Sequence, residues 1–213
     1  MRKLGQHFLM STAIAKRIVE SANVKPSDVV LEVGPGKGML TQFLVEKAKK
    51  VIAMEKDGAL AALLYEKFKN RKNLEIIEGD ILHCHAGLDP ASNRGSRIKC
   101  GMTSVFPKKY NIVANLPYYI TSRFLRLFLE ETPHKPQSMT LMVQKEVAER
   151  ICAAPPRMNL LALSVQAFGT PQMLFRVAAG SFSPPPEVDS AVISISGISD
   201  AFFKKHAVSP KEF

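Results

Sequence analysis

Short apolar stretches alternate with helical patterns along most of this chain, and this alternation constrains the fold more than any other feature. Stretches short and apolar enough to be buried strands are Val29–Val33, Val51–Glu55, Leu74–Glu78, Tyr110–Ala114, Met139–Gln144 and Ser190–Ser196. Helical periodicity covers Ala13–Ala22, Met39–Lys49, Ala59–Lys69 and Ser122–Glu131, and a short helical piece is expected from Ser199. Strands that alternate with helices predict an α/β fold with a parallel sheet covered by helices on both faces.

The segment His83–Val105 interrupts this rhythm. It combines glycine, proline and asparagine with scattered arginine and lysine, and it has neither a helical nor a strand period. A structureless connection of this length is uncommon in a compact domain and is usually functional or disordered. We therefore expect an exposed, mobile insertion, in which Arg94, Arg97 and Lys99 fit either RNA contacts or a solvated loop.

Charge and cysteine usage limit the classes of partner and location. A net charge of +10 and a pI near 9.6 fit a polyanionic partner such as nucleic acid, or simply a soluble basic protein. No apolar run approaches the ~20 residues of a membrane span, and the start lacks the apolar stretch of a signal peptide. Cys84, Cys100 and Cys152 are odd in number without Cys-x-x-Cys spacing, which indicates neither a disulfide framework nor a zinc site. A cytoplasmic protein without a metal is the simplest expectation.

Polar groups at the ends of the first three expected strands indicate a nucleoside site. The glycine-rich turn Gly34–Gly38 follows the first strand, and its glycines would let the backbone approach a ligand beside a helix N-terminus. Its G-x-G-x-G spacing differs from the G-x-G-x-x-G of dinucleotide sites. Glu55 ends the second strand, where a carboxylate can accept hydrogen bonds from both ribose hydroxyls. Asp80 follows the third, suited to an adenine amino group or to turn capping. NAD fits the first two groups equally well.

The segment Asn115-Leu116-Pro117-Tyr118 after the next strand bears on the ligand more directly. It brings together a side-chain amide, a carbonyl and an aromatic ring at the sheet edge where ligands of open α/β folds bind. An exocyclic amine on a flat base suits this set. The Asn115 side-chain oxygen and the Pro117 carbonyl would accept from the amine, favouring a pyramidal and more nucleophilic nitrogen, and Tyr118 would stack on the base.

At this point the chain resembles a known family, the small-subunit ribosomal RNA adenine dimethyltransferases. The resemblance runs from Lys3 to Ile195. It is carried, in order, by Arg2-Lys3-Leu4-Gly5-Gln6-His7-Phe8-Leu9, Glu32–Gly38, Glu55, Gly79-Asp80, Asn115–Tyr118, Val143–Arg150 and Phe182-Ser183-Pro184-Pro185-Pro186-Glu187-Val188-Asp189-Ser190.

The resemblance implies a Rossmann-like class I S-adenosylmethionine-dependent methyltransferase with a mostly parallel seven-stranded sheet. Such an enzyme places two methyl groups on N6 of each of two adjacent adenosines near the 3′ end of 16S rRNA, during ribosome biogenesis. Its partner would be the immature small ribosomal subunit, with no membrane involved, and we expect a monomer.

Site residues follow from the same resemblance. His7 and Leu9 would close over the methionine end of the cofactor and Gly34 would line it. Glu55 would hold the ribose, Asp80 the adenine, and Asn115 would border the transferred methyl group, while Glu32 resembles a position just beside the cofactor. Phe182 would face the target base opposite Tyr118, although ordinary core packing also suits it. Basic residues would form a track for rRNA phosphates: Lys145, Arg150, Arg157, Lys204 and Lys205.

The domain organisation expected is a methyltransferase domain over residues 1–198 and the start of a truncated C-terminal helical domain over residues 199–213. Two departures from the family pattern, at Val177–Gly180 and Pro156–Leu160, bear on RNA affinity and target choice. A catalytically weak or non-catalytic RNA-binding assembly factor on the same fold is an alternative. A dinucleotide-dependent oxidoreductase is disfavoured by Asn115–Tyr118.

Overall fold

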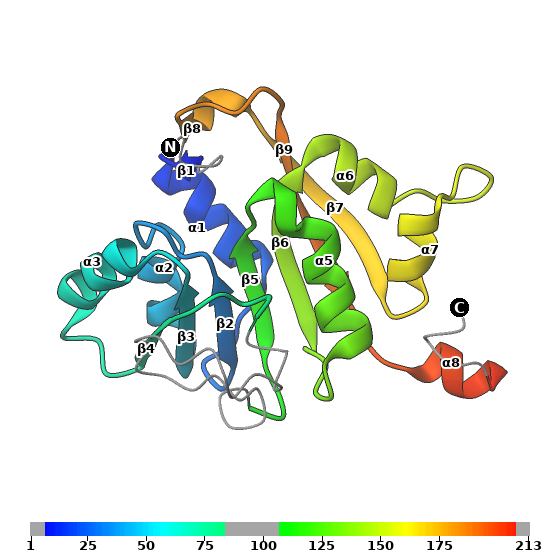
Figure 1. Cartoon of the computed structure of the whole chain (residues 1–213), viewed down its shortest axis with the longest axis horizontal. Coiled ribbons are helices and arrows are strands. Elements are labelled where there is room, and N and C mark those ends of the chain that lie inside the picture. Colours follow the sequence, from blue (N-terminus) through cyan, green and yellow to red (C-terminus); the bar gives the residue numbers. More distant parts are fainter. Residues whose placement is uncertain (1–6, 84–106, 208–213) are drawn as a thin grey trace.

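One seven-stranded sheet runs through the protein, whose computed structural model describes residues 7–83 and 107–207 (Figure 1). The strands lie in the order β4-β3-β2-β5-β6-β9-β7. Their bounds are β2 Val29–Val33, β3 Lys50–Glu55, β4 Leu74–Glu78, β5 Asn111–Asn115, β6 Ser138–Gln144, β7 Thr170–Val177 and β9 Ser190–Ser196. The five strands β4, β3, β2, β5 and β6 pair in parallel, whereas β9 pairs antiparallel with both β6 and β7. The expected mostly parallel sheet is confirmed.

The strands proposed from the apolar pattern are present within one residue of their predicted bounds. The pattern did not reveal β7, which lies at the edge of the sheet. Most of its side chains are partly or fully exposed, and Pro171 lies within it. An edge strand of this kind has no continuous apolar face, so its sequence lacks the period that marks the buried strands.

Helices cover both faces of the sheet, as the alternation predicted. Their bounds are α1 Thr12–Ser21, α2 Thr41–Lys47, α3 Gly58–Phe68, α5 Thr121–Arg126, α6 Lys145–Ile151, α7 Leu160–Gln166 and α8 Ala201–His206. A wider π turn, Leu127–Glu131, continues α5. Side-chain caps set three of the starts: Ser11 accepts from the Ile14 N–H, Asp57 from those of Ala59 and Leu60, and Asn159 from that of Ala162.

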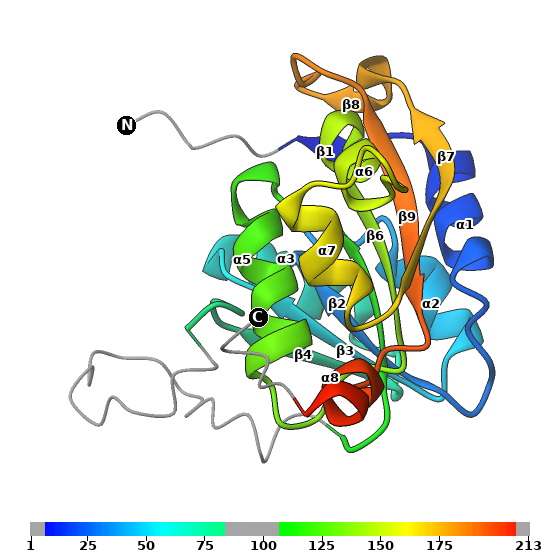
Figure 2. The same ribbon diagram turned by 90° about the vertical axis from the view of Figure 1, so that its right-hand side faces the viewer.

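Successive residues of a strand face opposite sides, and this produces two main hydrophobic clusters. Val30 and Val113 are fully buried in the cluster that includes α1 and α2. Their neighbours Leu31 and Ile112 are buried in the cluster that includes α5 and α7. Figure 2 shows α1 and α2 on one side of the sheet and α5 and α7 on the other. Because both faces are covered, the strand ends at the sheet edge are where polar groups meet solvent.

A small second sheet connects distant parts of the chain. Strand β1 (Phe8–Leu9) pairs antiparallel with β8 (Phe182–Ser183), so that Leu9 lies opposite Phe182. The Met10 N–H also donates to the Ser181 carbonyl at 2.8 Å. Two-residue strands are too short to show a period, and the sequence did not reveal them. The pairing brings residues 7–9 to the carboxyl edge of the main sheet (Figure 1).

Helix α8 packs near the amino ends of the parallel strands, opposite the edge where β1 lies. Phe203 is 3% exposed and its ring lies 4.7 Å from that of Phe168, centroid to centroid, within the main core. The helical piece expected from Ser199 is therefore present and shares that core. The insertion predicted at His83–Val105 lies, apart from His83, outside the described residues. Among the helices that the structure describes, none combines the length and apolarity needed to cross a bilayer.

Candidate active site

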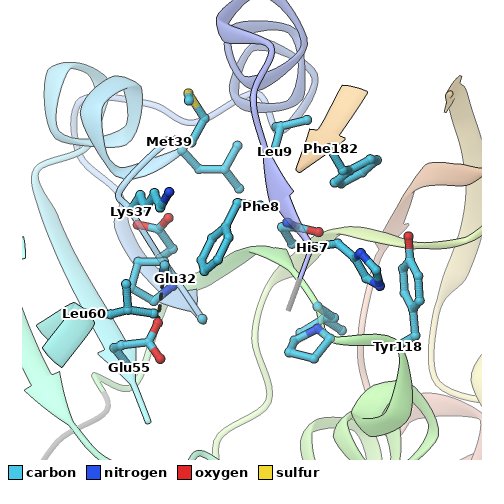
Figure 3. Close-up of a pocket in the computed structure, with 17 residues that line it drawn as sticks. His7, Phe8, Leu9, Glu32, Lys37, Met39, Glu55, Leu60, Tyr118 and Phe182 are labelled. Atoms are coloured by element: carbon cyan, nitrogen blue, oxygen red, sulfur yellow. Dashed lines mark hydrogen bonds between the residues drawn. The ribbon is translucent and has the colours of Figure 1, made fainter. Parts of the chain in front are cut away.

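A pocket opens where the carboxyl ends of β2, β3 and β5 meet the β1–β8 pair. Figure 3 shows side chains from all of these elements around one cavity. The lining residues are His7, Phe8, Leu9, Glu32, Gly34, Pro35, Gly36, Lys37, Met39, Leu40, Glu55, Leu60, Asn115, Leu116, Pro117, Tyr118 and Phe182. The pocket therefore brings together all the predicted site residues except Asp80.

The glycine loop shapes one wall of the pocket. Gly34, Gly36 and Gly38 have positive φ angles of 65°, 58° and 76°, which L side chains rarely adopt. A Cβ on Gly36 would lie 3.3 Å from the Phe8 ring, and one on Gly38 would lie 2.6 Å from Phe68. The loop thus needs glycine both for its backbone conformation and for close packing.

Glu55 is held in one orientation by the loop. The Gly36 N–H donates to its Oε2 and the Asp57 N–H to its Oε1, each at 3.0 Å. The carboxyl is 4% exposed and lines the pocket. A carboxylate oxygen can accept more than one hydrogen bond. Glu55 is therefore held in a fixed orientation and keeps acceptor capacity on both oxygens.

Glu32, on the neighbouring strand β2, lacks the backbone hydrogen bonds that hold Glu55. It is 1% exposed and lines the same pocket. Neither carboxyl oxygen forms a hydrogen bond of regular geometry within the described residues, although Thr41 lies close by. Burial raises the pKa of Glu32 to about 8, Thr41 partly opposes this rise, and the negative charge of Glu55 adds to it.

The Asn115–Tyr118 segment forms the wall opposite the loop. Asn115 is the last residue of β5, and its side chain forms no hydrogen bond with another described residue. The Pro117 carbonyl accepts from the Ile120 N–H at 3.1 Å in the short helix η1, Tyr118–Ile120. A carbonyl has two lone pairs, so one remains for a ligand. Two acceptors thus stand at the rim of the cavity.

Tyr118 is fixed at both its hydroxyl and its ring. Its hydroxyl is 2.8 Å from the Ser190 Oγ, and Ser190 is fully buried. Burial raises the pKa of Tyr118, so the phenol stays neutral. The His7 ring stacks on the phenol ring with centroids 5.9 Å apart and planes 26° apart (Figure 3).

The segment Phe182–Ser190 connects the pocket walls. Phe182, 5% exposed, pairs with Leu9. The Pro184 carbonyl lies 2.8 Å from His7 Nδ1, and since a carbonyl can only accept, that nitrogen carries the hydrogen. Asp189 accepts from the Ala179 N–H through its side chain and from the Lys145 N–H through its carbonyl. This segment thereby ties the N-terminal strand and α6 to the pocket.

Asp80 lies beyond the pocket lining, two residues past the end of β4. Its Oδ2 is 2.8 Å from the Lys56 Nζ and 3.0 Å from His83 Nδ1, and its Oδ1 accepts from the Leu82 N–H. Burial raises the pKa of Asp80, but hydrogen bonds from Lys56, Leu82 and His83 outweigh it and leave the pKa lowered. The carboxylate is charged and turned toward Lys56, at the same strand edge as Glu55.

Comparison with known proteins decides among the functional classes that such a pocket allows. The family model described as "Ribosomal RNA adenine dimethylase" matches residues 1–209. The chain belongs to this family. The expected resemblance is therefore confirmed, and the dinucleotide-dependent oxidoreductase is excluded.

Relatives in the dimethylase family are similar over nearly the whole chain. The "Ribosomal RNA small subunit methyltransferase A" of Dehalococcoides mccartyi strain 195 is 45% identical, over 96% of this chain and 68% of the relative. The protein of the same name from Pelotomaculum thermopropionicum is 42% identical, over 92% of this chain and 65% of its own length. The chain thus spans about two thirds of the length of these relatives.

Solved structures agree with the family assignment. A dimethyladenosine transferase from Plasmodium falciparum matches with a TM-score of 0.76 and 30% identity, over 93% of this chain and 66% of that one. The 23S rRNA methyltransferase ErmE matches with a TM-score of 0.74 and 28% identity, over 92% and 71%. The predicted class I methyltransferase fold is confirmed.

Other lining residues were not predicted as site residues. Phe8 sits between His7 and Leu9, and its ring reaches Gly36 and lies 4.9 Å from the Lys37 Nζ. The only sequence signal for Phe8 and Lys37 was that they lie within the motifs that carry the family resemblance. Ser190 closes the last motif, yet its role depends on a contact with Tyr118, 72 residues away.

The predicted basic residues do not all lie together. Lys145 and Arg150 are on α6, which follows the carboxyl end of β6 near the pocket. Lys204 and Lys205 are on α8, which follows the end of the antiparallel β9, where Ser196 pairs with the first residue of β6. The two groups lie at opposite ends of the sheet (Figure 1).

Replacing Gly38 by alanine tests the packing of the glycine loop. The added Cβ would meet Phe68 at 2.6 Å on a backbone with φ of 76°. We expect the free energy of unfolding to fall by about 2–4 kcal/mol, measured by urea denaturation. Gly180→Ala is the matched control, because a Cβ there meets nothing within 4 Å. Equal effects of the two substitutions would contradict the packing argument.

Glu32→Gln tests the protonation of the buried carboxyl. Between pH 4.5 and about 8 the folded protein keeps a proton on Glu32 that the unfolded chain has lost. Stability therefore falls as pH rises, by about 1.4 kcal/mol per pH unit in that window. We expect Glu32→Gln to gain stability relative to the wild type between pH 5.5 and 7.5 in urea titrations. Glu20→Gln, an exposed residue, should show no such trend.

Proposed function

We propose that this chain transfers methyl groups from S-adenosylmethionine to N6 of two adjacent adenosines near the 3′ end of 16S rRNA, forming N6,N6-dimethyladenosine during ribosome biogenesis. The observation that carries the proposal is that Asn115–Tyr118 faces the same pocket as the glycine loop and Glu55. A flat amine and a nucleoside cofactor would meet there, in a member of the rRNA adenine dimethylase family.

The pocket residues fit the cofactor. Glu55 would take the ribose diol, and the loop at Gly34 and Gly36 leaves room for a ligand to approach the backbone. His7 and Leu9 would cover the methionine end, where the unpartnered carboxyl of Glu32 offers two acceptor oxygens. Bound there, the sulfonium compound supplies a methyl group that is already activated for nucleophilic attack.

Asp80 would hold the adenine of the cofactor by accepting a hydrogen bond from the adenine amino group. Its Oδ2 is occupied by Lys56 and His83, while Oδ1 accepts a single backbone hydrogen bond. Lys56 is largely exposed and can move away without disturbing the core. The proposal therefore includes a small rearrangement of the Lys56–Asp80 pair on binding.

The acceptor side of the pocket would activate the target amine by positioning. The Asn115 side-chain oxygen and the free lone pair of the Pro117 carbonyl would each accept one N6 hydrogen. This arrangement turns the nitrogen lone pair out of the ring plane and toward the methyl group. Alignment of weak nucleophiles in this way can contribute several kcal/mol, on the order of 7–11 in well-oriented systems. The N6 proton would leave to water after transfer, when the nitrogen has become acidic.

Tyr118 and Phe182 would hold the flipped adenine. Tyr118 presents a neutral aromatic face at the rim, and Phe182 lines the pocket from β8. The His7 ring stacks on Tyr118 in this structure, so a base that used that face would displace it. The β1–β8 pair would then cover one side of the reacting groups.

The proposed partner is rRNA in the immature small subunit, bound by the protein as a monomer in the cytoplasm. Lys145 and Arg150 lie on α6, directly after the carboxyl end of β6, and would contact phosphates. We also propose residues 1–198 as the methyltransferase domain.

Asn115→Ala tests the acceptor site. We expect methyl transfer to immature small subunits to fall about 100-fold or more, because the target nitrogen loses its alignment. Cofactor binding, measured by calorimetry, should persist. Products should map by mass spectrometry to two adjacent dimethyladenosines in the wild type. Gln172→Ala, which removes an exposed amide on β7, is the control. No transfer by the wild type, or transfer only to cytosine or protein, would overturn the proposed function.

Ser190→Ala and Tyr118→Phe test the fixing of the ring. Each removes one side of the 2.8 Å contact. We expect kcat to fall by roughly tenfold in each, in line with the loss of about 1–2 kcal/mol of hydrogen bonding, and the double variant to be no worse than either. Binding of S-adenosylmethionine should not change. Additive losses would show that the two groups act separately. Ser196→Ala, at the exposed far end of β9, is the control.

A further inference from the structure

Glu32 is the buried carboxyl of the pocket that the proposed reaction leaves without a defined protonation state. It is 1% exposed, and neither of its oxygens forms a hydrogen bond of regular geometry within the described residues, where Thr41 is a nearby donor. Glu55 lies in the same pocket with two backbone N–H donors at 3.0 Å. An ionised carboxylate without donors is costly in a buried site, so an empty pocket favours the neutral acid at Glu32.

The surroundings of Glu32 reinforce this state. Glu55 from β3 adds a negative charge, which disfavours a second one. Lys67 from α3 and Thr41 from α2 favour the charged form, but their effects are smaller than that of burial. Lys37 and His7 also line the pocket. With the pKa of Glu32 raised to about 8, most molecules at pH 7 hold a proton there.

We propose that Glu32 gives up this proton when the α-ammonium group of S-adenosylmethionine docks against it, so that cofactor binding releases one proton to solvent. The inference rests on the proposed function for the identity of the ligand. Thr41 is a nearby donor to the two oxygens but forms no bond of regular geometry with them, and the ammonium group offers three donors. The sulfonium centre has none, so the ammonium is the partner that completes the carboxylate.

Proton release makes affinity depend on pH. Below the pKa of Glu32 each binding event must displace a proton, so the Kd for S-adenosylmethionine rises tenfold for each unit by which pH falls. Between pH 7 and pH 6 we therefore expect about a tenfold weaker Kd. Glutamine at this position accepts from the ammonium without titrating, so Glu32→Gln should lose most of this dependence.

Calorimetry in buffers with different ionisation enthalpies measures the proton directly. At pH 7 we expect close to one proton released on binding S-adenosylmethionine. S-adenosylhomocysteine, which keeps the ammonium but has no sulfonium, should release the same amount. Methylthioadenosine, which lacks the amino acid part, should release none. These arms use the wild-type protein and do not depend on the folding of any variant.

Glu32→Gln should bind S-adenosylmethionine with almost no proton release, and Glu20→Gln should behave as the wild type. Binding of S-adenosylmethionine without proton release would overturn the inference and leave the proposed function standing. Release that persists in Glu32→Gln, or release with methylthioadenosine, would assign the proton to another group and also overturn it. An absence of binding in the wild type would instead count against the proposed function itself.

Discussion

The parallel arrangement of β2, β3 and β5 is the constraint on which the rest of the structure depends. Parallel strands end at the same edge, and both faces of this sheet are covered by helices. Glu55 and Asn115 are the last residues of two of these strands, and Glu32 is next to last in the third. Their proximity is a consequence of strand direction, and no separate scaffold is needed to bring them together.

The second determinant is the segment Phe182–Ser190, which acts on residues far away in the sequence. It pairs with Leu9, accepts from His7 and orients Tyr118 through Ser190. A motif rich in prolines is poorly suited to regular structure, yet it can present carbonyl and hydroxyl groups at fixed places. This explains physically why the motifs at the two ends of the chain belong to one site.

Much of the fold and of the site could be predicted from the sequence, for identifiable reasons. Buried strands such as β2 are short and mostly apolar, the glycine loop to Gly38 follows β2, and Glu55 ends β3, where a buried acidic residue is unusual. The edge strand β7 could not be found, because its partly exposed side chains lack a period. The Tyr118–Ser190 and Lys56–Asp80 contacts were also missed, since contacts between distant residues leave no local pattern.

The shortness of β1 bears on how a ligand gains entry. Two residues pair with β8, and the strand adds the His7 hydrogen bond and the packing of Phe8 on Gly36. Breaking these contacts leaves every strand of the main sheet paired, so opening this segment costs the β1–β8 hydrogen bonds and the burial of Leu9 but no strand of the main sheet. A ligand that entered past β1 would therefore reach the pocket without any strand of the main sheet coming apart.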